Sequence, residues 1–374
     1  MAKCRAWVMV EPGKVVMEEL EIPKVAEDCA LLKVEACGVC GTDKHIFYHG
    51  DGPMAPFPFI AGHEVIGTIV ELGSKANDNM AVFGGVLEAG DRVSLAPSPM
   101  GCGHCYYCLH MPHRPYLCSQ RSVIYGFSSV NKAPGIWGGY SEYIYLLPRS
   151  YVFKLSKDMP MKRAILIEPA AVGLRAVERA FSSGEPFMSQ RYGVGRSAMV
   201  LGAGPIGLMV IASLRYSGAG LIIAQDLFTS RLDMAKRMGA DILINGNLPL
   251  EERLKQVREA TEGVGPDIVI EVAGTLAAFR EALDFTRRGG KLIEAGIFID
   301  VGAADIKPFN ICSQDLDIHG CRYSPLIFKD VISMLERTPL PVEEVVTHTL
   351  PLAELPKGLE LTGSADVGKV VILP

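Results

Sequence analysis

The sequence predicts an α/β protein in two parts, a β-rich N-terminal part and a part built on a doubly wound parallel sheet. Three observations support this prediction. Residues 1 to about 160 contain short strand-like segments separated by Gly, Pro and Asp. After residue 161, apolar strands alternate with helical segments, which implies crossover units and a parallel sheet. A glycine-rich turn at residues 202–207 lies between one such strand and a helix.

The bulk properties fit this organisation and narrow the function. A chain of 374 residues can hold two domains and bury a sizeable core. The net charge of -5, without any basic block, argues against nucleic acid or an anionic membrane as a partner. Residues 1–6 lack the features of a signal peptide, and no apolar run is long enough to span a bilayer. We therefore expect a cytoplasmic protein.

The two halves differ in their expected elements. In the first half, irregular loops are expected to carry the Cys and His residues between strands at 7–10, 30–37, 65–72, 92–95 and 140–146. In the second half, the expected strands are 197–201, 221–226, 241–245, 268–271 and 291–295, and the expected helices are 205–216, 230–238, 250–261 and 279–288. The last segment predicts helices at 326–336 and 353–361 and strands at 345–350 and 368–373.

The glycine-rich turn predicts a dinucleotide site. Gly202 permits the tight turn, Gly204 lets the backbone approach a pyrophosphate, and Gly207 allows close packing of helix on strand. Pro205 and Ile206 begin the helix, whose N-terminus favours phosphate. The alternative is a structural turn that binds no nucleotide.

An acidic residue indicates which dinucleotide is bound. Asp226 lies 22 residues after Gly204 and closes the next strand, where a carboxylate binds ribose hydroxyls and repels a 2′-phosphate. We therefore expect NAD rather than NADP, although Arg231 supplies a base nearby.

Cys40 and His63 predict a catalytic zinc with one open coordination position. Glu168 is our candidate for the third protein ligand, with Glu64 as a rival or alternate ligand. The two glycines that flank Cys40, Gly38 and Gly41, suit a backbone that must bend around a metal. The alternative is a buried thiol and a core histidine without a metal.

Three residues that follow Cys40 suit proton transfer at such a metal. The Thr42 hydroxyl suits acceptance of a proton from an alcohol, and Asp43 is placed to orient the His63 ring. His45 can carry the proton to solvent, because the ordinary imidazole pKa lies near neutrality. A plain surface histidine is the alternative for His45.

Four cysteines predict a second, closed metal site: Cys102, Cys105, Cys108 and Cys118. Four thiolates without an open position are typical of structural zinc. An iron–sulfur cluster is the main alternative. Close cysteine spacing in a cytosolic protein favours metal over disulfides.

These motifs together resemble the zinc-dependent medium-chain alcohol dehydrogenases, in their polyol, threonine and secondary-alcohol branch. The resemblance covers nearly the whole chain and implies a GroES-like catalytic domain and a Rossmann NAD-binding domain. The implied boundaries are 1–163 for the GroES-like domain with both zinc sites, 164–324 for the Rossmann domain and 325–374 for a segment that completes the first domain. The pattern Gly320-Cys321-Arg322-Tyr323 resembles sorbitol dehydrogenases, which implies that Arg322 and Tyr323 reach the substrate.

Further expectations follow from the same resemblance. The residues implied to line the nicotinamide are Val272, Ala273, Gly274, Ala295, Gly296 and Ile297. Residues 76–88 resemble an insertion and are expected to form a surface loop. The resemblance also favours a homotetramer over a dimer.

The combined hypothesis is hydride transfer between NAD and a secondary alcohol, diol or polyol, or the matching ketone or aldehyde. The expected cofactors are NAD, one catalytic zinc and one structural zinc. One alternative is a reductase of the same fold that acts on an activated double bond. Another is a non-enzymatic NADH-binding protein with structural zinc only.

Overall fold

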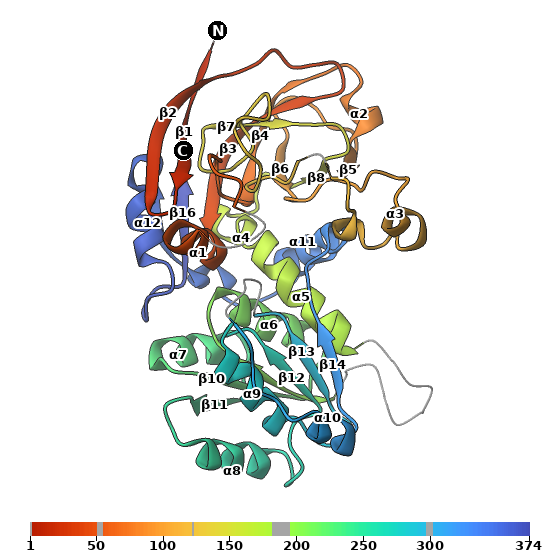
Figure 1. The fold of residues 1–374 in the computed structure, drawn as a ribbon, viewed down its shortest axis with the longest axis vertical. Coiled ribbons are helices and arrows are strands. Elements are labelled where there is room, and N and C mark those ends of the chain that lie inside the picture. Colours follow the sequence, from red (N-terminus) through yellow and green to blue (C-terminus); the bar gives the residue numbers. More distant parts are fainter. Residues whose placement is uncertain (1, 51–54, 122, 182–194, 297–301) are drawn as a thin grey trace. The chain divides into compact units, whose positions relative to one another are not determined.

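The computed structural model describes residues 2–50, 55–121, 123–181, 195–296 and 302–374. They divide into two compact units, each with its own sheet (Figure 1). Unit 1 comprises residues 1–168, 324–336 and 346–374, and unit 2 comprises residues 169–323 and 337–345. None of the helices within the described ranges has the length and apolar character needed to cross a bilayer.

Unit 1 is built on an eight-stranded, mostly antiparallel sheet and a two-stranded ribbon. Its strands are β1 Lys3–Glu11, β2 Lys14–Glu21, β3 Ala30–Val39, β4 Glu64–Leu72, β5 Ala81–Phe83, β6 Arg92–Leu95, β7 Tyr143–Leu146, β8 Tyr151–Lys154, β15 Val346–Pro351 and β16 Lys369–Leu373. Its helices are α1 Gly41–His49, α2 Ala76–Asn79, α3 Tyr106–His110, α4 Met161–Ala164, α11 Phe328–Arg337 and α12 Leu355–Leu361. Single 3₁₀ turns cover Pro115–Leu117, Pro325–Ile327 and Leu352–Glu354.

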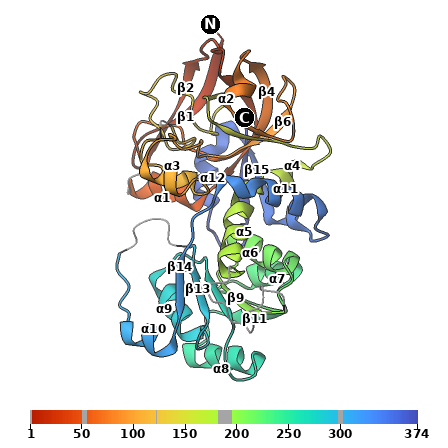
Figure 2. The same ribbon diagram turned by 90° about the vertical axis from the view of Figure 1, so that its right-hand side faces the viewer.

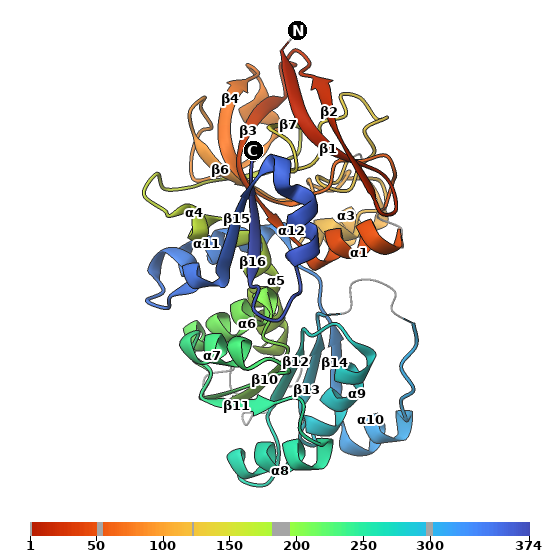
Figure 3. The same ribbon diagram turned by 90° about the vertical axis from the view of Figure 1, so that its left-hand side faces the viewer.

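The end of the chain completes the sheet of unit 1. Strand β16 lies between β15, which is parallel to it, and β3, which is antiparallel to it (Figure 3). Val370 pairs with Val39, the residue before Cys40. Residues more than 300 positions apart in sequence therefore meet beside the predicted metal ligands.

Unit 2 is a six-stranded parallel sheet in the order β11-β10-β9-β12-β13-β14, the strand order of doubly wound dinucleotide-binding folds. Helices α6 and α7 lie on one side of the sheet, and α9 and α10 lie on the other (Figure 2). The strands are β9 Ser197–Leu201, β10 Leu221–Asp226, β11 Ile242–Asn245, β12 Ile268–Glu271, β13 Lys291–Glu294 and β14 Asp317–Gly320. The helices are α6 Pro205–Tyr216, α7 Thr229–Arg237, α8 Leu250–Ala260, α9 Leu276–Phe285 and α10 Pro308–Gln314, and Val342–Val345 forms a 3₁₀ turn. Helix α5, Ile167–Phe181, begins in unit 1 and continues in unit 2.

The sequence predicted the elements of unit 2 most accurately. Strands β9, β10 and β12 and helix α6 have the expected bounds. These strands are almost entirely buried, because helices cover both faces of a parallel sheet, so they appear in the sequence as uninterrupted apolar runs. Strand β14 was missed because its sequence, Asp-Ile-His-Gly, has no such run.

Two expectations for unit 1 are wrong. Residues 76–88 are not a simple surface loop: they form α2 and β5, and β5 pairs in parallel with β8. Ala76, Met80 and Leu87 from this segment are buried in the core. The residues after Cys40 are not an irregular loop but helix α1, which was missed because Gly41, Thr42 and Asp43 are weak helix formers.

Candidate metal centres and dinucleotide site

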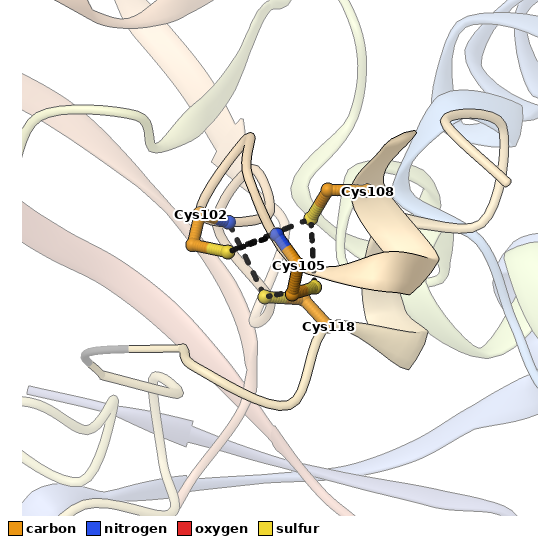
Figure 4. A group of neighbouring side chains, drawn as sticks. All are labelled: Cys102, Cys105, Cys108 and Cys118. Carbon is orange, nitrogen blue, oxygen red and sulfur yellow. Dashed lines mark hydrogen bonds between the residues drawn. The ribbon is translucent and has the colours of Figure 1, made fainter. Parts of the chain in front are cut away.

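The four cysteines of the second predicted metal site converge on one point in unit 1 (Figure 4). Cys105 precedes α3 and Cys108 lies within it, while Cys102 comes from the preceding loop. The Sγ atom of Cys108 lies 3.5 Å from that of Cys105 and 3.9 Å from that of Cys102, and the Sγ atoms of Cys105 and Cys118 are 3.9 Å apart. A disulfide needs an S–S distance of about 2.05 Å, so these thiols are not paired covalently.

The sulfur geometry fits a single tetrahedral ion. A zinc ion with four Zn–S bonds of about 2.3 Å places its sulfurs about 3.8 Å apart. A polynuclear iron–sulfur cluster distributes its thiolates over separate irons, which requires a wider spread of the sulfurs. The backbone N–H groups of Cys102 and Gln120 donate to the sulfur of Cys118, at 3.2 and 3.4 Å. The backbone N–H of Cys108 lowers the pKa of the Cys105 thiol to about 6, so this group is a thiolate at neutral pH.

The first predicted metal site is also assembled in unit 1. The ligand atoms of Cys40, His63 and Glu64 all lie within 4.8 Å of one another. Strand β3 ends just before Cys40 and β4 starts at Glu64, and these strands are antiparallel neighbours. Adjacent strand ends therefore bring together side chains that are 23 residues apart in sequence.

The structure corrects our interpretation of Gly38. This glycine is part of β3 and pairs with Glu64. A Cβ atom at Gly38 would lie 2.0 Å from Oε2 of Glu64, whereas one at Gly41 would meet nothing within 4 Å. Gly38 therefore makes room for the Glu64 carboxylate, and it does not serve to bend the backbone.

Asp43 supports the predicted ligands from a fully buried position. Its Oδ1 atom faces Nδ1 of His63 at 3.3 Å. Its Oδ2 atom accepts hydrogen bonds from the backbone N–H of Cys40 at 3.1 Å and from the Tyr140 hydroxyl at 2.7 Å. Burial alone would raise the pKa of Asp43, but the His63 ring and these hydrogen bonds outweigh burial and lower it. The Asp43 carboxylate thus stays charged and holds both the His63 ring and the backbone of Cys40 in place.

A buried lysine contacts the third member of the cluster. Lys369 of β16 donates to Oε1 of Glu64 at 2.6 Å and to the carbonyl oxygen of Val39 at 3.2 Å. Lys369 and Glu64 are 3% and 1% exposed, so the pair is shielded from water. The other Glu64 oxygen, Oε2, is buried without a hydrogen-bond donor. A buried carboxylate oxygen without a hydrogen-bond donor is suited to bind a cation.

Glu168 lies near this cluster but outside its compact part. It is buried near the start of α5. Burial raises its pKa to about 7, the His63 ring opposes this rise, and Glu64 adds to it. The charges of His63 and Glu64 therefore act on Glu168. The cluster whose ligand atoms lie within 4.8 Å of one another, however, contains Glu64 and not Glu168. Glu64 and Glu168 are thus both candidates for the third ligand.

The remaining predicted residues occupy defined positions. Thr42 and His45 are half-buried on α1, and the His45 ring lies 4.7 Å from that of His49. Arg322 and Tyr323 are half-buried and follow β14 in unit 2.

Tyr140 and Lys369 were missed by the sequence analysis. The sequence signal for Lys369 is a cation at the start of the otherwise apolar run Val370–Leu373. Tyr140 has no local signal, because its partner Asp43 lies 97 residues away.

The glycine-rich turn of unit 2 has the geometry expected for a phosphate site. Gly202 has a φ of +97°, which only glycine adopts easily. Gly204 is the N-cap of α6 and Pro205 follows it at the first helical position. A Cβ atom at Gly207 would lie 1.9 Å from the carbonyl oxygen of Gly202. The helix N-terminus therefore packs closely on the turn and presents its N–H groups there.

Asp226 is held in place beside this turn. Its Oδ2 atom accepts a hydrogen bond from the backbone N–H of Ala203 at 2.7 Å, and Oδ1 accepts one from the N–H of Phe228 at 3.0 Å. Arg231 lies 3.9 Å from Oδ2 and packs over the Phe228 ring, with 5.0 Å from its guanidinium carbon to the ring centroid. The two loops expected to line the nicotinamide follow β12 and β13, although Ile297 lies outside the described residues.

Two family models and a curated relative match the chain. Residues 26–157 match the family model of the alcohol dehydrogenase GroES-like domain, and residues 205–337 match that of the zinc-binding dehydrogenases. An erythritol/L-threitol dehydrogenase of Mycolicibacterium smegmatis is 31% identical to the chain, with 100% of this chain and 98% of the relative covered.

Two solved structures extend the comparison. An alcohol dehydrogenase from Thermotoga maritima has a TM-score of 0.89 and 29% identity, with both chains fully covered. A putative zinc-binding dehydrogenase from Sinorhizobium meliloti bound to NADP has a TM-score of 0.85 and 25% identity, with both chains fully covered. The chain belongs to the zinc-dependent medium-chain alcohol dehydrogenase family, and its predicted α/β fold class is confirmed.

Proposed function

We propose that this protein is an NAD-dependent dehydrogenase that exchanges a hydride with a secondary alcohol, diol or polyol, or with the matching ketone or aldehyde. The convergence of Cys40, His63 and Glu64, with Asp43 behind the histidine, carries this proposal. This cluster favours an enzyme with a catalytic zinc. It argues against a protein that has structural zinc alone and against a double-bond reductase that needs no metal.

The proposed catalytic zinc is held by Cys40, His63 and one of two carboxylates, Glu64 or Glu168. When bound, zinc supplies a Lewis acid that favours ionisation of the substrate hydroxyl. Lys369 adds one positive charge beside Glu64 and Glu168, and it offsets part of the negative charge that the two carboxylates bring to the site when no metal is bound.

The protein's own groups then orient the substrate and move its proton. Asp43 fixes the His63 ring through Nδ1, so that Nε2 is left for the metal. Thr42 is proposed to relay the proton: its hydroxyl takes up the proton of the alcohol and releases its own toward His45, three residues further along α1, which passes it to solvent. Asp226 binds the adenosine ribose, and the N-terminus of α6 binds the pyrophosphate.

NAD is the proposed cofactor because the Asp226 carboxylate has a fixed position. This carboxylate would repel a 2′-phosphate, and Arg231 already lies beside Asp226 and over the Phe228 ring.

Arg322 and Tyr323 are proposed to contact the substrate. We also propose a cytoplasmic homotetramer with a second, structural zinc at the cysteine quartet, which light scattering and metal analysis can test.

The function is tested by NADH formation with zinc-replete protein. The substrate panel comprises secondary alcohols, vicinal diols, sugar alcohols, L-threonine and anionic hydroxy compounds. Activity with one group supports the proposal and identifies the substrate class. Two zinc ions per chain, with one remaining in Cys40→Ser, would support the catalytic site. A single zinc ion in the unmodified protein would favour the non-enzymatic alternative.

A matched pair of variants tests the ligand assignment. Cys40→Ser and His63→Ala should abolish turnover and leave NADH binding intact, because both residues lie in unit 1 and the dinucleotide groups lie in unit 2. Cys29→Ser is the control, since Cys29 is a buried thiol of unit 1 outside both cysteine-containing metal groups. Unchanged turnover in Cys40→Ser would contradict the assignment.

A further inference from the structure

A buried tyrosine supports both of the segments that carry the proposed zinc ligands of unit 1. Tyr140 is fully buried, and its hydroxyl donates a hydrogen bond to Oδ2 of Asp43 at 2.7 Å. The same Oδ2 atom accepts a hydrogen bond from the backbone N–H of Cys40 at 3.1 Å. The other carboxylate oxygen, Oδ1, faces Nδ1 of His63 at 3.3 Å. A single carboxylate thus links the Tyr140 hydroxyl to both Cys40 and His63.

The backbone and the ring of Tyr140 are held against the segment that precedes His63. The N–H of Tyr140 donates to the carbonyl oxygen of Ala61 at 3.1 Å, and its carbonyl oxygen accepts a hydrogen bond from the N–H of Trp7 at 2.9 Å. A Cβ atom at Gly62 would lie 2.9 Å from Cδ1 of the Tyr140 ring, so the ring packs directly on the backbone of this residue. Gly62 has a φ of +88°, which glycine adopts easily. The backbone and the ring together therefore determine where the hydroxyl lies.

The Tyr140 hydroxyl fixes the orientation of the Asp43 carboxylate. The last side-chain torsion of aspartate is broadly distributed, so a single donor determines the direction of the carboxylate only loosely. Two donors on Oδ2, the Tyr140 hydroxyl and the N–H of Cys40, leave Oδ1 directed at His63. A histidine that binds a metal is oriented by the partner of its other ring nitrogen. The hydroxyl therefore acts on the His63 ring through Asp43.

Burial makes the loss of this hydroxyl consequential. Asp43 and Tyr140 are both 0% exposed, and His63 is 7% exposed, so bulk water does not reach the carboxylate. A hydrogen bond to an ionised acceptor is stronger than a neutral one, and a buried acceptor that loses its donor is left without compensation. The orientation of Asp43 thus depends on the protein groups around it rather than on solvent.

We propose that Tyr140 is a positioning residue whose hydroxyl raises the zinc affinity of the site at Cys40 and His63 by fixing Asp43. This inference rests on the proposed catalytic zinc, because it requires a metal at these ligands. Without the hydroxyl, the carboxylate turns more freely and holds the His63 ring less firmly, so zinc binds less tightly. The cysteine quartet is held by other segments, and its zinc should be unaffected.

The test compares the full-length protein with Tyr140→Phe, which removes only the hydroxyl. Zinc affinity is measured by competition with a chelator of known affinity, and the zinc that remains in Cys40→Ser identifies the ion of the cysteine quartet. The affinity of the other site should fall by about tenfold, the lower end of the loss that is typical for partners of metal-binding histidines. The zinc of the quartet should be retained in full.

Cobalt(II) provides a second readout that does not depend on turnover. Its visible absorption bands depend on the geometry of its ligands, and subtraction of the Cys40→Ser spectrum isolates the bands of the site at Cys40 and His63. These bands should shift in Tyr140→Phe, because the His63 ring is held less firmly.

Tyr125→Phe is the matched control. Tyr125 is also fully buried in unit 1, and its hydroxyl lies 2.7 Å from the Ser150 hydroxyl and accepts a hydrogen bond from the N–H of Leu147 at 2.9 Å. This variant loses a buried, hydrogen-bonded hydroxyl of the same kind and should also lose folding stability. Its zinc affinity and cobalt bands should be those of the unmodified protein, which separates positioning from a purely structural role.

A double-mutant cycle tests whether Tyr140 acts through Asp43. Asp43→Asn removes the charge that faces the His63 ring and should itself weaken zinc binding. Tyr140→Phe should add little further loss in that background, because the connection to His63 is already broken. Asp43→Asn also serves as the second variant if Tyr140→Phe does not fold. An unchanged zinc affinity in Asp43→Asn would leave the hydroxyl without a route to the metal and would refute the inference.

Three further results would overturn the inference. The first is unchanged zinc affinity with unchanged cobalt bands in Tyr140→Phe, and the second is an equal loss of zinc affinity in Tyr125→Phe. The third is full additivity of the two losses in the double-mutant cycle. Failure of the proposed function is distinct from all three, because the unmodified protein would then bind a single zinc ion, at the cysteine quartet.

Discussion

At the residue scale, Lys369 shows how one charge can stabilise a site assembled from distant parts of the chain. It is the first residue of the otherwise apolar strand β16 and is almost fully buried. A buried cation is costly unless it is paired and hydrogen-bonded. Glu64 and the Val39 carbonyl meet both requirements. The lysine therefore makes a buried Glu64 carboxylate compatible with folding.

Replacement of this lysine should be strongly destabilising. Lys369→Met leaves the Glu64 charge buried without its partner, a change that typically costs about 3–5 kcal/mol of folding free energy. Urea unfolding should show this loss, while Lys369→Arg should retain most of the stability. Lys255→Met on α8 is the control, because Lys255 is exposed and pairs weakly with Glu259. Equal stability of Lys369→Met and the unmodified protein would mean that the ion pair is not structurally important.

A second residue-scale prediction concerns the choice of cofactor. Asp226→Ala removes the carboxylate proposed to bind the ribose, and it also removes the acceptor for the N–H of Ala203. The ratio of kcat/KM for NAD to that for NADP should fall by at least about tenfold, which corresponds to roughly 1.4 kcal/mol of discrimination. Asp233→Ala on α7 provides a matched control. Better activity with NADP in the unmodified protein would contradict the assignment of Asp226.

At the scale of elements, the lobe at residues 102–118 depends on its metal rather than on a core of its own. Helix α3 has five residues and none of them is buried. Tyr106 and Leu109 of this helix are 67% and 63% exposed. A helix with so little apolar burial is expected to gain its order from metal–thiolate bonds, so metal binding and local folding are coupled there.

The packing around the cysteines allows a test of this dependence. A Cβ atom at Gly101 would lie 2.3 Å from the Cys108 sulfur, so Gly101→Ala should displace a ligand. We expect this variant to retain about one zinc ion per chain and to be cleaved by protease within the lobe. Gly320→Ala is the control, because a Cβ there meets nothing within 4 Å. Two retained zinc ions in Gly101→Ala would show that the site tolerates the clash.

At the scale of the whole molecule, unit 1 is closed by strands from the end of the chain. Strand β16 is an interior strand of its sheet, and four of its five residues are buried. Its loss would expose the edge of β3 and remove Lys369 in one step. The last residues are therefore part of the core of the unit that begins at the N-terminus.

A truncation tests this closure. A chain that ends at Asp366 should fail to form a stable unit 1 and should lose the metal at Cys40, which zinc analysis and thermal unfolding would reveal. Removal of Pro374 alone is the control, because it leaves β16 complete. Normal zinc content and stability of the longer truncation would contradict the expected role of β16.

The sequence by itself determined the features whose chemistry lies within short segments. The cysteine quartet spans 17 residues, and the glycine-rich turn with its helix start spans six, so spacing alone predicted a metal site and a dinucleotide site. The strands of unit 2 were also predictable, because burial on both faces leaves continuous apolar runs. The proximity of Cys40 and His63 was an inference from ligand types and family resemblance, and the pairing of β3 with β4 supplies its physical basis.

The tertiary structure alone decided which residues support these sites. Lys369 lies 305 residues from Glu64, and Tyr140 lies 97 residues from Asp43, so no local pattern connects them. Strand register sets Glu271 opposite Glu294, and each glutamate alone resembles an ordinary strand end. The structure also changed our interpretation of Gly38, because the Glu64 side chain of the neighbouring strand fills the space beside this glycine. Sequence patterns record local geometry and burial, whereas pairs of charges and close contacts between strands arise only when the chain has folded.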